Sequence, residues 1–244
     1  MLYFHFKLYN EQQRQLAEQN VLLGQLNRMK TELFGNISHE LKTPVTVIRG
    51  SLEALCDGVV TDPVQMQNYH RQMLKESLFL QRLINDLLDL SKLQNTEFQI
   101  EMQPLNLCDI LSDAVRSAEH LAQKKEIELQ LQLDVPALPI TGDYGRLRQM
   151  LLIVLDNAIK FSPPHSTVEL ALSNRVVSVA DHGKGIAADE LPHIFDRFYK
   201  AASADNQTGS GLGLAIAKQI AERHGVAVAV TSTAGTGSRF TFTF

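Results

Sequence analysis

One histidine in the sequence stands five residues before a proline, in a stretch with helical character. Residues 34–46 read FGNISHELKTPVT and contain His39, Glu40 and Pro44. A neutral imidazole is a good nucleophile near pH 7, and the Glu40 carboxylate can take the proton from its other nitrogen. Because Pro44 removes the N–H that would bond the Glu40 carbonyl, the helix is expected to break or loosen beside His39. Taken alone, a surface histidine beside a surface glutamate is the simpler interpretation.

A second group of polar residues shares one helix face in DNAIK, residues 156–160. Asn157 lies one turn before Lys160, and Ile153 lies one turn before Asn157 on the same face. An amide oxygen suits Mg²⁺, which takes few protein ligands, and an ammonium suits a phosphate. The pair therefore fits a magnesium nucleotide, although a solvated polar face explains it at least as well.

The stretch VADHGKGI, residues 179–186, combines an acid with glycines. Asp181 follows a predicted strand, and Gly183 and Gly185 come directly after it. Glycines let the backbone approach a flat ligand while the carboxylate accepts a hydrogen bond from an amino group. Turns of this kind are common in loops, so the motif is weak by itself.

A second glycine-rich stretch, GSGLGLAIA, spans residues 209–217. Its glycines at 209, 211 and 213 precede or open a helix, whose N-terminal N–H groups can bind an anion. It is not a Walker A loop, because no GK[ST] follows, and no strand precedes it as in a dinucleotide-binding turn.

His39 lies on the first of two predicted amphipathic helices. Apolar residues recur at heptad-like spacing over residues 11–55 and again after residue 63, where Asp62 is a predicted N-cap and Pro63 the first helical residue. At about 100° per residue, His39 lies about 200° from Ile37 and thus faces solvent. One hairpin cannot bury its apolar face alone, so pairing of two copies into a four-helix bundle is predicted.

Strand and helix patterns mix over the remaining 140 or so residues, which predicts a two-layer α/β domain. Strands are predicted at residues 98–102, 127–133, 167–172, 175–180, 226–232 and 238–244, and helices at 106–123, 144–161 and 212–223.

Composition narrows the function classes. The 244 residues are 44% hydrophobic and 20% charged, as in ordinary globular proteins. A net charge of -4 without a basic block argues against nucleic acid as a partner. The two cysteines, Cys56 and Cys108, have no metal-like spacing and indicate free thiols in a reducing compartment. No run reaches the roughly 18 apolar residues of a membrane span. Residues 1–10 fit either the tail of such a span or the start of an amphipathic helix.

In this order the motifs resemble the transmitter part of bacterial two-component sensor histidine kinases. FGNISHELKTPVT resembles the family's H box, LLIVLDNAIKFS its N box, VADHGKGI and GSGLGLAIAK its two glycine boxes, and IFDRFYK (residues 194–200) its F box. The polar residues 201–207 then correspond to a lid. The resemblance covers about residues 25–244, and five ordered motifs are far more specific than any one of them.

The resemblance implies an α+β fold with a linker helix and two domains. Residues 1–24 would be a juxtamembrane or coiled-coil linker helix, and 25–95 a dimerisation and histidine phosphotransfer hairpin. Residues 97–244 would be a catalytic ATP-binding sandwich of the Bergerat type. The full-length protein would lie on the cytoplasmic side of the membrane, with an upstream sensor or membrane segment missing from this chain, which itself would be soluble.

The resemblance also implies ATP and Mg²⁺ as cofactors. Asp181 would accept from the adenine amino group, Asn157 would bind the metal, and Lys160 would bind a phosphate. Phe161 would line the adenine pocket, and Arg197 would contact the γ-phosphate. The implied cofactor-binding residues are Asn157, Lys160, Phe161, Asp181, Gly183, Gly185, Ile186, Gly209, Gly211, Leu212 and Gly213.

The implied activity is autophosphorylation of His39, polarised by Glu40, with the helix bending at Pro44. Transfer to an aspartate of a response regulator receiver domain would follow. Glu40 and Thr43 also fit the family's ExxT phosphatase pattern. Transfer within or between the two subunits depends on the handedness of the turn at residues 56–61.

Position 153 departs from the family pattern, which often has a second asparagine there, whereas this sequence has Ile153. A supporting polar contact to the metal or phosphates is then lost. Two alternatives therefore stay open: a catalytically weak, ATP-sensing phosphatase or scaffold, and an ATPase clamp of the same nucleotide-binding fold, which would not need His39.

Overall fold

A computed structural model of the protein describes residues 2–95, 97–200 and 209–244. The chain divides into two units, Met1–Leu80 and Gln81–Phe244. Within the described residues, no helix combines the length and apolar character needed to span a bilayer.

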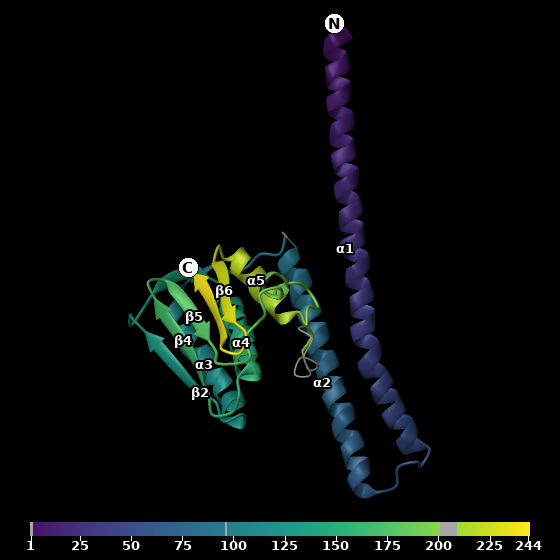
Figure 1. Cartoon of the computed structure of the whole chain (residues 1–244), viewed down its shortest axis with the longest axis vertical. Helices are drawn as coiled ribbons and strands as arrows, with labels where there is room; N and C mark the ends of the chain where they lie inside the picture. The colour runs from purple at the N-terminus through teal and green to yellow at the C-terminus, as the bar shows by residue number, and fades with distance from the viewer. Residues whose placement is uncertain (1, 96, 201–208) are drawn as a thin grey trace. The chain divides into compact units, whose positions relative to one another are not determined.

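The first unit is a helical hairpin formed by α1 (Leu2–Cys56) and the first part of α2 (Pro63–Gln94) (Figure 1). Helix α1 continues through Pro44, so the predicted break beside His39 is wrong. Only one backbone hydrogen bond is lost to a proline in a helix of 55 residues, and the buried Pro44 ring contributes to packing. The hydroxyl of Thr46 donates to the Lys42 carbonyl at 2.8 Å, a contact that helices tolerate.

Two predictions about this hairpin are confirmed. His39 is exposed, whereas Ile37, on the opposite side of α1, is half-buried. The Asp62 carboxylate accepts from the Gln65 N–H at 2.8 Å, which places it as the N-cap of α2 with Pro63 as the first helical residue.

The second unit is built around a five-stranded mixed sheet in the order β2-β4-β5-β7-β6. Its strands are β2 (Glu128–Leu133), β4 (Thr167–Ser173), β5 (Val176–Ala180), β6 (Ala227–Thr233) and β7 (Gly237–Thr243). Strands β2 and β4 are parallel, and the other neighbours are antiparallel. A separate antiparallel pair consists of β1 (Gln103–Asn106) and β3 (Pro139–Gly142).

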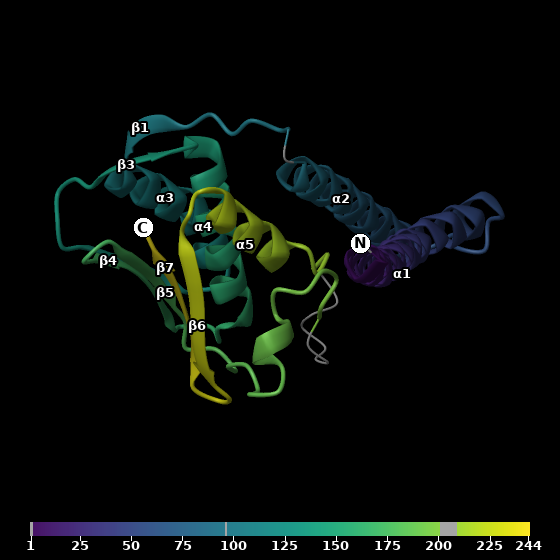
Figure 2. The same cartoon turned by 90° about the horizontal axis from the view of Figure 1, so that it is seen from above.

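One face of the sheet is covered by α3 (Leu107–Lys124), α4 (Tyr144–Phe161) and α5 (Gly213–Arg223), as Figure 2 shows. On β4, Val168, Leu170 and Leu172 alternate with more exposed residues, so one side of the strand is apolar and faces the helices. This arrangement confirms the predicted two-layer α/β domain. The fully buried side chains of the core come from both layers: Leu107, Ile110, Leu111, Leu147, Met150, Leu151, Leu155, Ile159, Leu170 and Phe242.

The strand predicted at residues 98–102 is wrong, because the strand in this region is β1, at residues 103–106. The Phe98 carbonyl accepts from the Arg223 guanidinium of α5, and the Phe98 ring lies 5.9 Å below Arg146. Phe98 is thus held by helical residues and not by strand pairing, whereas Met102 at the other end of the alternating pattern is exposed. The partner strand β3 was missed, since four residues beginning with a proline give little periodicity.

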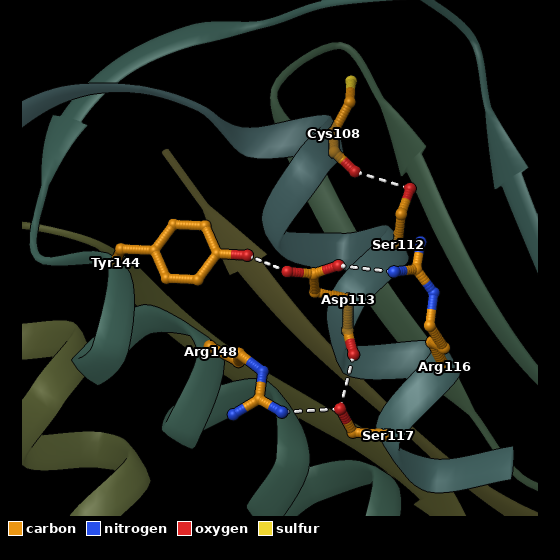
Figure 3. Close-up of polar contacts among 7 residues, drawn as sticks. All are labelled: Cys108, Ser112, Asp113, Arg116, Ser117, Tyr144 and Arg148. Atoms are coloured by element: carbon orange, nitrogen blue, oxygen red, sulfur yellow. Dashed lines mark hydrogen bonds and ion pairs between the residues drawn. The ribbon is translucent and has the colours of Figure 1, made fainter.

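Helices α3 and α4 are joined by a polar network (Figure 3). The Tyr144 hydroxyl donates to the Asp113 carboxylate, and this bond raises the pKa of Tyr144. One turn further on, Arg148 donates to the Ser117 hydroxyl at 2.5 Å. Asp113 also pairs with Arg116 at 3.5 Å within α3. These contacts fix the relative positions of α3 and α4, and α4 carries candidate site residues.

The last turns of α2 belong to the second unit and contact α4 and α5 through polar groups. Asp89 accepts from Arg146 at 2.8 Å and from Gln149 at 2.7 Å. Partial burial acts to raise the pKa of Asp89, but these two hydrogen bonds and the nearby positive charges together outweigh it and lower the pKa. From α5, Arg223 donates to the carbonyls of Leu93 and Asn95 at 3.3 and 3.0 Å.

Candidate functional site

Helix α4 carries the first group of site residues. Its start is capped by Asp143, which accepts from the Arg146 N–H at 3.0 Å. Its last carbonyls, of Ile159 and Lys160, accept from the Lys125 ammonium, the first at 3.0 Å. A cation at this end complements the helix dipole. Asn157 and Lys160 are both half-buried on the last turn, directly before Phe161.

Asp181 follows β5, and its carboxylate is held by the backbone. Oδ1 accepts from the N–H groups of Gly183 at 2.9 Å and Ser238 at 3.2 Å. Within the described part of the chain these are the hydrogen bonds of this carboxylate, so Oδ2 remains for a ligand. Burial raises the pKa of Asp181, and the two backbone donors offset part of this effect. A buried acceptor fixed in this way can recognise an amino group.

The glycines of the first glycine stretch are required because neighbouring backbone leaves no room for a side chain at these positions. A Cβ on Gly183 would lie 2.6 Å from the Phe161 carbonyl oxygen. Gly185 has a φ of 68°, and a Cβ there would lie 2.1 Å from the Thr233 carbonyl oxygen. The loop thus packs against the end of α4 and the β6–β7 hairpin. Neighbouring Ile186 donates its N–H to the Ser232 hydroxyl at 2.8 Å.

The second glycine stretch meets the same end of α4. A Cβ on Gly209 would lie 3.4 Å from Lys160 Nζ, and one on Gly213 would lie 3.2 Å from Ile153 Cγ2. Gly213 begins α5, with the buried Leu212 as its N-cap residue. The side chain at position 153 therefore packs against this helix start.

The F box contacts the second glycine stretch through Phe198, whose N–H donates to the Gly211 carbonyl at 2.8 Å. Gly211 has a φ of 72°, and a Cβ there would lie 2.7 Å from the Phe198 Cα. Arg197 is exposed and makes no hydrogen bond or ion pair within the described residues. The predicted lid, residues 201–207, lies outside the described residues.

The ring of Phe161 is the meeting point of two of these segments. Lys160 Nζ lies 4.9 Å from the ring centroid, and Lys184 Nζ lies 4.8 Å from it. Cations over an aromatic face are attracted by its quadrupole. Residues far apart in the sequence are thus gathered around Phe161 and Asp181.

The residues present fit a magnesium nucleotide. Asp181 supplies an acceptor for a base, Asn157 an oxygen ligand for a hard cation, and Lys160 a positive charge for a phosphate. Next to Phe161, Ser162 carries the one buried side-chain oxygen without a hydrogen-bond partner among the described residues. Such an orphaned hydroxyl beside the site matches a place where a ligand or water completes the hydrogen bonding.

Three features of the site were not predicted from the sequence. The Ser238 N–H and the Gly183 N–H donate to the same carboxylate oxygen of Asp181. The Lys184 ammonium lies over the Phe161 ring. The Ser210 hydroxyl donates to Asp86 of α2 at 2.7 Å, and burial raises the pKa of Asp86. In the sequence, the only signal for Lys184 and Ser210 is the pair of glycines that flanks each of them.

His39, Glu40 and Thr43, the other predicted site residues, lie in the first unit.

Two known families match the chain. Residues 29–96 match the His Kinase A (phospho-acceptor) domain. Residues 142–244 match the family described as histidine kinase-, DNA gyrase B-, and HSP90-like ATPase.

Curated relatives include two sensor proteins. The phosphate regulon sensor protein PhoR of Pseudomonas aeruginosa is 32% identical over 250 residues, covering 100% of this chain and 56% of PhoR. Sensor protein SrrB of Staphylococcus aureus is 32% identical over 233 residues, covering 88% of this chain and 38% of SrrB. The chain thus spans about half of the first relative and less of the second.

Solved structures share the fold. Acinetobacter baumannii histidine kinase AdeS matches with a TM-score of 0.67 and 24% identity, covering 84% of this chain and 95% of AdeS. Full-length ShkA, in complex with AMPPNP, matches with a TM-score of 0.61 and 28% identity, covering 86% of this chain and 45% of ShkA. Histidine kinase ThkA, in complex with response regulator protein TrrA, matches with a TM-score of 0.70 and 22% identity, covering 86% of this chain and 60% of ThkA.

Proposed function

Since the chain belongs to the two-component sensor histidine kinases, as the transmitter core of such a protein, we propose that it phosphorylates His39 with ATP and passes the phosphoryl group to a response regulator. The observation that carries this proposal is the convergence of the N box and both glycine stretches around Phe161 and Asp181, with the F box packed on the second glycine stretch through Phe198. These segments bring together an acceptor for a base, an oxygen ligand for a cation and a positive charge for a phosphate, which is the set of groups that a magnesium nucleotide requires.

In this proposal the second unit binds the nucleotide. Asp181 Oδ2 accepts from the adenine amino group, and Phe161 lines the pocket. Lys160 binds a phosphate, and Asn157 holds magnesium, which neutralises charge on the phosphate oxygens when bound. The complex of ShkA with AMPPNP supports an adenine nucleotide as the ligand of this fold.

His39 is the proposed nucleophile. Its free imidazole nitrogen attacks the γ-phosphorus, the bond from phosphorus to the β-phosphate oxygen breaks, and ADP leaves. Glu40 accepts the proton from the other ring nitrogen, so that the phosphohistidine is neutralised as it forms. Little covalent help is needed, because phosphoryl transfer depends mainly on positioning and charge. Arg197 is proposed to contact the γ-phosphate during transfer.

An aspartate of a receiver domain is the proposed final acceptor. The complex of ThkA with TrrA supports a response regulator as the partner. A homodimer is proposed because the hairpin leaves apolar side chains exposed, with Phe34 57%, Leu74 61% and Leu78 49% exposed. A further sensor segment in the full-length protein is proposed because the matched region covers only 56% of PhoR and 38% of SrrB.

Incubation of the chain with γ-labelled ATP and magnesium tests the function. The expected product is labelled protein whose label is lost in acid and stable in base, as a phosphohistidine is. Release of labelled phosphate without labelled protein would instead indicate the ATPase clamp. Binding of ATP with neither product would indicate a sensing phosphatase or scaffold, which the addition of a phosphorylated regulator would then reveal.

Replacing Asn157 with alanine is expected to remove magnesium-dependent labelling. No second asparagine stands at position 153, where Ile153 packs against Gly213, so nothing on this face replaces the lost amide. Labelling rates are measured across a magnesium titration, with the exposed Asn68→Ala of α2 as the matched control. If Asn157→Ala keeps more than about a tenth of the rate, a change below about 1.4 kcal/mol, the metal role is wrong.

Replacing Thr43 with valine is expected to keep the kinase activity and remove the phosphatase activity on the phosphorylated regulator. Thr43 is exposed one turn from His39, and its only described hydrogen bond is a long one, 3.4 Å, to the His39 carbonyl. The hydroxyl is thus available to orient a water, while valine keeps the branching that suits a residue before proline. Thr46→Val, which removes a hydroxyl bonded at 2.8 Å, is the control. Unchanged phosphatase activity would exclude a role for the Thr43 hydroxyl.

A further inference from the structure

Lys184 lies in the first glycine stretch and starts from a fixed backbone position. Its carbonyl oxygen accepts from the Gly235 N–H at 2.7 Å. On one side Gly185 packs against the Thr233 carbonyl, and on the other Gly183 packs against the Phe161 carbonyl. The loop is therefore anchored both to the β6–β7 turn and to the end of α4. The Lys184 side chain itself is exposed.

The ammonium groups of Lys184 and Lys160 share one aromatic ring. They lie 4.8 and 4.9 Å from the Phe161 centroid, and the two nitrogens are thus within about 10 Å of each other. Each is attracted by the ring, but the two like charges repel. Two positive charges thus gather on one ring in the same part of the unit as Asp181, an arrangement that suits a ligand with several negative charges.

From this arrangement we infer that Lys184 is a second phosphate-binding residue, acting beside Lys160 on the phosphate chain of the nucleotide. The inference rests on the proposed function and adds a residue to it. Lys184 lies in the loop that follows Asp181, the proposed acceptor for the base, and its proposed contact is with the phosphates that ATP and ADP share. Lys160 lies one turn after Asn157, the proposed metal ligand, and its proposed contact is with the phosphates that carry the metal. Lys184 therefore sets the affinity for product as well as substrate.

A simpler role for Lys184 is to cover the Phe161 ring with its aliphatic stem. The two roles separate in Lys184→Met, because methionine keeps a long stem that packs on aromatic rings and lacks the charge. Lys184→Arg keeps the charge. Lys124→Met, at the exposed end of α3, makes the same change in net charge away from the site.

The test compares the whole chain and these variants for binding of ATP, ADP and adenosine, by calorimetry for the nucleotides and by NMR titration for adenosine. Lys184→Met is expected to bind ATP and ADP about tenfold more weakly, as loss of one charge-assisted contact predicts. Its adenosine affinity and its melting temperature without ligand are expected to match the wild type. Lys184→Arg and Lys124→Met are expected to bind all three ligands normally.

Two results would overturn the inference while leaving the proposed function intact. Equal weakening of ATP, ADP and adenosine in Lys184→Met would mean that the lysine shapes the pocket around Phe161. Unchanged binding of all three would mean that the lysine is only a solvent-exposed cover. A wild-type chain that binds no adenine nucleotide would overturn the proposed function itself, and the inference with it.

Discussion

His39→Gln is expected to reduce labelling from γ-labelled ATP to the level of a reaction without protein. Glutamine keeps a polar side chain of similar reach but has no nucleophilic nitrogen, so no covalent product forms. His39 is exposed on α1, in the unit that does not contain Asp181 and Phe161, so the fold and ATP binding are expected to be unchanged. Labelling, calorimetric ATP affinity and the circular dichroism melting curve measure these three properties.

His70→Gln is the matched control, since His70 is an exposed histidine on α2 of the same hairpin. It is expected to label at the wild-type rate. Acid-labile label retained in His39→Gln would show that another residue is the acceptor. Lost ATP binding in that variant would show that His39 contributes to the nucleotide site and would contradict its proposed role as the acceptor alone.

Asp181→Asn is expected to weaken ATP binding by about 100-fold. The variant loses a charged acceptor, and it places the donor NH₂ of asparagine against the donor amino group of adenine. Because Gly183 and Ser238 fix Oδ1 as an acceptor, the amide NH₂ must take the place of Oδ2. It then opposes the adenine amino group. Inosine triphosphate carries an oxygen at that position, so the variant is expected to lose far less affinity for it. Equal loss of both nucleotides would contradict this geometry.

The same variant is expected to be at least as stable as the wild type at pH 7. The pKa of Asp181 is raised by burial above its ordinary 3.8, so the folded chain favours the protonated carboxyl. The contribution of Asp181 to the free energy of unfolding is fully present below pH 3.8 and is lost as pH rises through the pKa of the folded state. Asparagine does not ionise and so avoids this loss. The difference in unfolding free energy between the variant and the wild type should therefore shrink in acid. Thermal unfolding at pH 7 and near pH 3.5 measures it.

The sequence predicted those elements that local patterns define. Helix α4 was predicted at residues 144–161 and lies at Tyr144–Phe161, because an N-capping Asp143 and a 3.6-residue apolar period mark it. The two antiparallel pairs β4–β5 and β6–β7 were recognisable from alternation around turn residues. Residues 98–102 alternate in the same way, yet they form no strand, and the Phe98 carbonyl bonds Arg223, over a hundred residues later. Local periodicity carries no information about such a partner.

The candidate site shows the same division. The residue types at Asp181, Asn157 and Lys160 were enough to predict them as site residues, because the chemistry of their side chains is visible in the sequence. The reason for the glycines was not visible. They were predicted to admit a ligand, whereas Gly183 and Gly185 are in direct conflict with the backbone of Phe161 and Thr233 if they gain a Cβ. Likewise, Lys184 is an ordinary loop residue until the fold brings Phe161 beneath it.

The glycine backbone around Asp181 has a consequence for drug resistance. Escape from a competitive inhibitor commonly arises through exchange of a side chain that touches the compound. Here Gly183 and Gly185 offer no side chain to exchange, and a Cβ on Gly237 would lie 2.0 Å from the Asp181 carbonyl oxygen. Asp181 is itself the proposed acceptor for the adenine of the natural ligand. A compound that binds only this carboxylate and the backbone beside it leaves few substitutions that exclude the compound and still permit folding.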